Sequence, residues 1–104
     1  MPTNGDDVRR ALADGRAIHG DRVVVFVLPG TGSVAFVAGR RVGGAVSRNR
    51  ARRILRAAWR EIGPRIVDGY DFVLVARASI AGARSDELVA EVEQVLLRAE
   101  MISG

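Results

Sequence analysis

Two periods of apolar residues along this 104-residue chain predict its helices and strands. Over residues 47–62, apolar side chains recur every three or four positions, which at about 100° per residue gathers them on one face of a helix. The same period returns over residues 86–99. Ser47 and Ser85 are candidate N-caps, and Gly63 followed by proline would end the long helix. The predicted buried faces are Ala51, Ile54, Leu55, Ala58 and Ile62 in the long helix, and Leu88, Val92, Val95, Leu96 and Ala99 in the last helix.

A shorter helix is predicted over residues 6–14. Asn4 is its candidate cap, its first turn is acidic, and Gly15 would stop it. The apolar face of this helix would consist of Val8, Ala11 and Leu12.

Runs of β-branched and aromatic residues predict three strands. Residues 22–28 and 33–38 are separated by a turn rich in glycine, so we expect them to form a hairpin. Residues 71–76 have no polar face, which indicates a strand buried on both sides. Helices before, between and after these strands predict one α+β domain over residues 1–104, a two-layer sandwich in which a small mixed sheet packs with three helices.

The composition excludes several kinds of active site. The chain has no cysteine and one histidine, so it can form neither a disulfide, nor a thiolate metal site, nor a zinc site with several histidines. The histidine, His19, is expected in a solvated loop. Neighbouring carboxylates lie on predicted helices, where the helix dipole and solubility explain them, so we predict no catalytic residue and no metal ligand in this chain. No segment approaches the about 18 apolar residues of a membrane span, so we expect cytoplasmic residence and no membrane partner.

Charge is distributed very unevenly along the chain. Residues 40–60 hold eight arginines and no acidic residue, whereas the remaining residues hold the other eight arginines and all twelve carboxylates. GC-rich coding explains the absence of lysine better than a preference for phosphate does, so the clustering of the arginines carries the argument. Such a basic segment repels itself, and a polyanionic partner such as nucleic acid would supply the missing negative charge.

The basic residues of the long helix gather opposite its apolar face. We call this set, together with the neutral Asn49 among them, the arginine face; it consists of Asn49, Arg52, Arg53, Arg56 and Arg60. About five phosphate contacts would give a log–log salt dependence of binding near −4 to −5. A solvated helix face is the alternative, although such faces usually mix both signs of charge. Asn49 would either read a base edge or be an ordinary polar residue of a first helical turn.

Two further features adjoin this helix. Arg40 and Arg41 are followed by the glycine pair Gly43 and Gly44, whose backbone amides could approach a phosphate at the start of the helix. Trp59 lies at the boundary between the apolar and basic faces, where we expect it to pack, with base stacking as the alternative.

The segment Arg40-Arg41-Val42-Gly43-Gly44-Ala45-Val46-Ser47-Arg48-Asn49-Arg50-Ala51-Arg52-Arg53-Ile54-Leu55-Arg56 closely resembles the signature of the bacterial ribonuclease P protein component. The similarity extends to the strand at 71–77 and to the opening helix, Gly15-Arg16 and strand, so it covers nearly the whole chain. In that family a small protein assists a catalytic RNA that cleaves the 5′ leader from precursor tRNA.

The resemblance implies a protein cofactor of the ribonuclease P RNA and of precursor tRNA, with Mg²⁺ acting through the RNA and no obligate protein partner. It also implies an unusual left-handed crossover from the strand before Arg40, through the long helix, to the strand at Phe72. The RNA-binding residues it implies are Arg40, Arg41, Arg48, Asn49, Arg50, Arg52, Arg53, Arg56 and Arg60.

The resemblance further implies a cleft for the single-stranded leader between the first helix and the sheet. The lining residues would be Val8, Leu12, Val24 and Phe26. Two family features are absent here: the helix positions are commonly phenylalanine, which would stack on bases, and Gly44 replaces a frequent asparagine. Core packing is the alternative role for all four residues.

Two other functions remain open from the sequence. One is a non-enzymatic RNA-binding protein, for instance a ribosome-associated one, that uses the same basic helix. The other is a DNA-binding protein whose basic helix enters a major groove, where Asn49 could pair with adenine.

Overall fold

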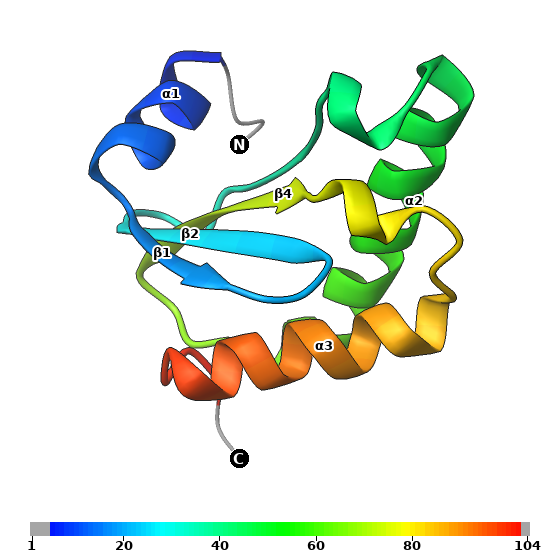
Figure 1. Ribbon diagram of the computed structural model, residues 1–104. Helices are drawn as coiled ribbons and strands as arrows, with labels where there is room; N and C mark the ends of the chain where they lie inside the picture. Colours follow the sequence, from blue (N-terminus) through cyan, green and yellow to red (C-terminus); the bar gives the residue numbers. More distant parts are fainter. Residues whose placement is uncertain (1–4, 103–104) are drawn as a thin grey trace.

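The computed structural model describes residues 5–102, which form three α-helices and a four-stranded sheet (Figure 1). The elements follow the chain in the order α1 (Gly5–Asp14), β1 (Arg16–His19), β2 (Val23–Pro29), β3 (Val34–Ala38), α2 (Ala45–Ile62), β4 (Tyr70–Ala76) and α3 (Ser85–Arg98). Short 3-10 turns flank the helices. η1 (Arg40–Val42) precedes α2, η2 (Gly63–Arg65) follows it, and η3 (Ala78–Ile80) precedes α3.

The sheet has the strand order β1-β2-β4-β3. β1 and β2 form an antiparallel hairpin, β4 pairs antiparallel with β2, and β3 pairs parallel with β4. The mixed α+β architecture with three helices is therefore confirmed, but the predicted hairpin of 22–28 with 33–38 is wrong, because β4 inserts between these two strands. β1 was not predicted, since three of its four residues are exposed and give no apolar pattern.

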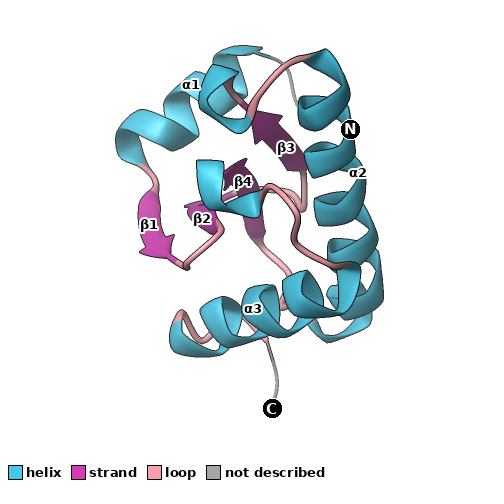
Figure 2. Cartoon of the chain, turned by 45° about the vertical axis from the view of Figure 1, so that its right-hand side comes forward, coloured by secondary structure: helices cyan, strands magenta, loops and turns pink. Residues whose placement is uncertain are grey.

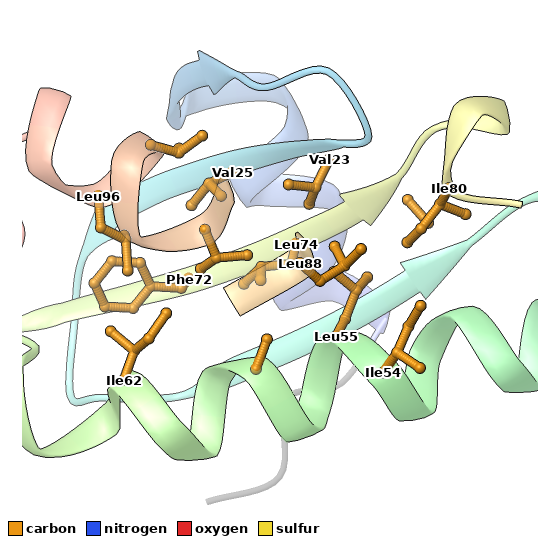
Figure 3. Close-up of a cluster of buried hydrophobic side chains, with 14 of the residues drawn as sticks. Val23, Val25, Ile54, Leu55, Ile62, Phe72, Leu74, Ile80, Leu88 and Leu96 are labelled. Atoms are coloured by element: carbon orange, nitrogen blue, oxygen red, sulfur yellow. The ribbon is translucent and has the colours of Figure 1, made fainter. Parts of the chain in front are cut away.

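The main core lies between the sheet and the helices α2 and α3 (Figure 3). Val25 of β2 and Leu74 of β4 are fully buried and face Leu55 of α2. Every residue of the two predicted buried helix faces is buried in the structure. α1 packs against β2 and β4 from the other side of the sheet, as the end-on view in Figure 2 shows.

The helix ends differ from the prediction. α2 begins at Ala45 after the extended residue Gly44, so Ser47 lies within its first turn and is not the cap. Gly63 keeps helical angles and leads into η2. α3 begins at Ser85 itself, and the carboxylate of Glu87 accepts a hydrogen bond of 2.9 Å from the backbone N–H of Arg84, the residue before the helix. The predicted cap of α1, Asn4, lies outside the described residues.

α2 connects the parallel strands β3 and β4, so the predicted strand–helix–strand crossover is present. Its left-handed sense stays a prediction of the resemblance. α1 fits its predicted apolar face in part, because Ala11 is buried and Val8 half-buried, whereas Leu12 is 43% exposed.

Asp71, at the start of β4, holds the loop that leads into β3. Its Oδ1 atom accepts hydrogen bonds from the backbone amides of Thr31, Gly32 and Ser33 at 3.0, 3.0 and 2.9 Å. A Cβ atom on Gly30 would lie 2.1 Å from the other carboxylate oxygen, so glycine leaves the space that this carboxylate occupies. The loop and β4 are thereby fixed to one another at the start of the parallel pair.

Ion pairs fasten the β1–β2 hairpin to α3. Arg22 lies 3.2 Å from Glu87 and 3.2 Å from Glu91, and its backbone N–H also donates to Glu91 at 2.7 Å. Arg98 donates to the carbonyl oxygen of His19 at 2.8 Å. Two carboxylates of α3, Glu87 and Glu91, are thus used on the side of the molecule that faces the hairpin.

Candidate nucleic-acid interface

The arginine face covers the outer side of α2. Asn49, Arg53, Arg56 and Arg60 are exposed, while Arg52 is half-buried and donates a hydrogen bond to Asn49 Oδ1. Within residues 5–102, no arginine of α2 forms an ion pair. The helix therefore presents several cationic groups in a row that no carboxylate pairs with, which is the arrangement that a phosphate backbone neutralises.

Arg48 and Arg50 flank this face. Arg48 is half-buried on the side of α2 next to Arg52. Arg50 lies on the opposite flank, where its Nη2 atom donates to the carbonyl oxygen of Ala83 at 2.6 Å. This contact joins α2 to the loop before α3, so one end of the Arg50 guanidinium is already engaged within the protein.

The segment before α2 continues the basic surface. Arg40 and Arg41 are exposed in η1, and the buried side chain of Val42 anchors the turn between them and the helix. Gly43 has φ 138°, which L side chains rarely adopt, so glycine is required for the chain to reverse here. The exposed Gly44 then starts the helix, with its carbonyl accepting from Arg48 N–H at 2.9 Å.

The predicted leader-binding residues meet at the side of the sheet that α1 covers. Val24 and Phe26 alternate with the core residues of β2, and their partners across the sheet are Val75 and Val73. Val8, Val24 and Phe26 are half-buried. This face is thus apolar and only partly covered, and Phe26 is the aromatic member among the four predicted residues.

Comparison with known proteins decides the family. Residues 3–100 match the family model for ribonuclease P. The chain belongs to the ribonuclease P protein family.

Curated relatives and solved structures agree with this assignment. The chain is 36% identical to the ribonuclease P protein component of Dehalococcoides mccartyi over 97% of its length and 85% of the relative's. It is 42% identical to that of Symbiobacterium thermophilum over 86% of its length and 82% of the relative's. The ribonuclease P protein of Staphylococcus aureus shares the fold, with a TM-score of 0.84, 19% identity and coverage of 97% of this chain and 95% of that one. The Thermotoga maritima protein gives a TM-score of 0.83 at 20% identity, covering 100% of this chain and 99% of that one.

The resemblance found in the sequence is therefore confirmed. This chain is the protein subunit of ribonuclease P, an endoribonuclease holoenzyme that takes part in tRNA 5′ maturation. The ribosome-associated protein and the DNA-binding protein, both open from the sequence, do not describe this family. As a ribonuclease P protein component, the chain is associated with the ribonuclease P RNA.

The structure adds one arginine to the basic surface of this ribonuclease P protein. Arg77 follows β4, and because β3 and β4 are parallel, it emerges at the same edge of the sheet as Arg41. Both residues line a depression of about 400 Å³ together with Ser79. The sequence shows that Arg77 directly follows a predicted strand. It does not show the parallel pairing that brings Arg77 next to Arg41.

The structure shows the surroundings of Trp59 and His19, for which the sequence predicted packing and a solvated loop. Trp59 is half-buried against the core, with its ring centroid 4.8 Å from that of Phe72, so the packing expectation is confirmed. His19 is exposed, as expected, but it ends β1 and does not lie in a loop. Among residues 5–102 there is no cluster of three or more potential metal ligands, and no helix long and apolar enough to cross a membrane.

Proposed function

We propose that the arginine face, with Arg48 beside it, is the surface through which this subunit binds the ribonuclease P RNA. The observation that carries the proposal is the row of α2 arginines without ion pairs, on a chain whose α3 carboxylates are engaged elsewhere. Arg40, Arg41 and the amides of the glycine turn extend this surface to the start of the helix, where the helix dipole favours a phosphate. Arg50 contributes by positioning the loop at Ala83.

The substrate side of the proposal concerns the opposite face of the sheet. The 5′ leader of precursor tRNA would lie along Val8, Leu12, Val24 and Phe26, with Phe26 as the aromatic platform for a base. Phosphate neutralisation by the protein would lower the Mg²⁺ concentration that the RNA needs, while the reaction itself stays with the RNA. The chain would act in the cytoplasm as one domain, without an obligate protein partner.

The test is a reconstitution with the ribonuclease P RNA from the same source. Cleavage of a precursor tRNA is followed at low magnesium with the wild-type protein and with the double variant Arg53→Ala/Arg60→Ala. The matched control is Arg16→Ala/Arg98→Ala, which removes the same charge at the end of the molecule away from α2 (Figure 1). We expect the α2 variant to lose stimulation and the control to keep it.

The salt dependence of RNA binding gives an independent measure. Loss of two phosphate contacts should reduce the magnitude of the log–log slope by roughly 1.5 to 2, and the control variant should leave it unchanged. Because Arg98 also bonds to the His19 carbonyl, urea unfolding is used to show that both double variants fold. Equal effects of the two folded variants would show that net charge matters and that the arginine face does not, which would refute the proposal.

A further inference from the structure

A groove between β3 and α2 lies beside the arginine face. It has a volume of about 570 Å³ and we call it the β3–α2 groove. Its lining residues are Val34, Ala35, Phe36, Arg56, Trp59 and Arg60. The groove therefore combines an apolar lining with two guanidinium groups.

The aromatic residues of the groove are held in place from below. Phe36 and Trp59 are half-buried and pack against the main core. The tilted contact of Trp59 with Phe72, at an interplanar angle of 57°, fixes the indole from the core side. The guanidinium of Arg56 lies over the Phe36 ring, with its central carbon 5.3 Å from the ring centroid. The planar groups of Phe36, Trp59 and Arg56 are thus held in position by the core, which favours stacking of a planar ligand.

Among residues 5–102, the strand that borders the groove has one edge without a strand partner. There β3 pairs with β4 alone, and the Phe72 N–H donates to the Ser33 carbonyl at 2.9 Å. Because backbone groups alternate in direction along a parallel pair, the amides and carbonyls of Val34 and Phe36 face the open edge. These donors and acceptors match the hydrogen-bonding edge of a nucleobase.

The charge of the groove selects an anionic ligand. Arg56 and Arg60 are exposed and form no ion pair within the described residues. A planar group beside a phosphate is the chemistry of a single unpaired nucleotide, whose base can stack on aromatic rings and on guanidinium planes. A base-paired nucleotide is already stacked between its neighbours and could not enter.

We propose that the β3–α2 groove holds one unpaired nucleotide of the ribonuclease P RNA. The base stacks against Trp59 and the Arg56–Phe36 pair, and Arg60 binds its phosphate. The inference rests on the proposed function, because it extends the RNA-binding surface of α2 without a break from the arginine face into the groove. The groove adds to that surface a site that recognises unpaired RNA by stacking. The charge of the arginines alone does not provide such recognition.

The single tryptophan of the chain makes the proposal testable. Trp59 fluorescence is recorded while the full-length protein is titrated with the ribonuclease P RNA, and separately with a blunt RNA duplex and with precursor tRNA. We expect the ribonuclease P RNA to quench the fluorescence because a base stacks on the indole. The duplex should bind through the arginines in a salt-sensitive manner without quenching.

A pair of matched variants gives the second measurement. Phe36→Leu removes the ring in the groove, and Phe26→Leu makes the same substitution on the opposite face of the sheet. Phe36→Leu should weaken binding of the ribonuclease P RNA about five- to tenfold without changing the salt slope, since stacking is lost and no phosphate contact is. Phe26→Leu should leave binding of this RNA unchanged, and urea unfolding of both variants shows that they fold.

Several outcomes would overturn the proposal. Saturated binding of the ribonuclease P RNA without a change in Trp59 fluorescence would show that the groove stays empty. Loss of stimulation in Arg53→Ala/Arg60→Ala would in that case still support the proposed function. Quenching by precursor tRNA alone would assign the groove to the substrate. Fluorescence that depends on protein concentration without RNA would assign the open β3 edge to a second copy of the chain.

Discussion

The contact between Arg50 and Ala83 leads to a prediction that separates folding from RNA binding. Arg50→Ala removes a charged donor from a carbonyl whose residue is 4% exposed. Hydrogen bonds of charged groups contribute about 1.5–3 kcal/mol, and the partial exposure of this one places the expected loss near 1.5–2 kcal/mol. For a domain of this size each kcal/mol corresponds to about 4–8 °C, so the melting temperature should fall by roughly 6–16 °C.

Thermal unfolding followed by circular dichroism measures this loss, with Arg53→Ala as the control. Arg53 is exposed on the same helix and its substitution should change stability by no more than about 0.5 kcal/mol. For RNA binding the order reverses: Arg53→Ala should reduce the magnitude of the salt slope by about 0.9, and Arg50→Ala should leave it nearly unchanged. Unfolding of Arg50→Ala at the wild-type temperature would refute the assignment of this arginine to the loop.

Three further predictions concern the core, the loop and the leader. Leu55→Ala truncates a fully buried side chain and should lower the free energy of unfolding in urea by about 2–5 kcal/mol; a loss below about 1 kcal/mol would contradict the packing described. Gly30→Ala forces its Cβ onto the Asp71 carboxylate and should destabilise by about 1–2 kcal/mol, and in a double-mutant cycle with Asp71→Ala the two losses should not add; additive losses would mean that the steric contact is not the cause. Phe26→Leu should weaken holoenzyme binding of precursor tRNA and not of mature tRNA, and equal effects on both would show that this residue does not contact the leader.

The helices were the part of the fold best predicted from the sequence. The buried faces of α2 and α3 follow from apolar spacing alone, because each helix buries one stripe against the same core. Their first residues were predicted less well. Ser47 has the side chain of a cap, but the extended Gly44 begins the helix earlier, and no local preference distinguishes the two starts. Helix ends depend on the approach of the chain, which the sheet determines.

Strand pairing and the groove depended on contacts that are distant in the sequence. Residues 22–28 and 33–38 satisfy every local requirement of a hairpin, yet β4 pairs with both strands, and Asp71 at the start of β4 binds the loop between them. Arg77 meets Arg41 for the same reason, through the parallel pair. Phe36 likewise reaches α2 only after β3 takes the edge of the sheet, so no spacing rule could place it near Arg56.

The pairing of the carboxylates away from α2 affects the stability of the free subunit, before it binds RNA. Glu87 and Glu91 are engaged by Arg22, and Glu93 by Arg65, whereas no arginine of α2 has a carboxylate partner among residues 5–102. Part of the energy released by assembly is then relief of a repulsion already present in the free subunit. Polyanions of any kind should raise its melting temperature, and in a cell the unbound subunit is the form most exposed to unfolding and degradation.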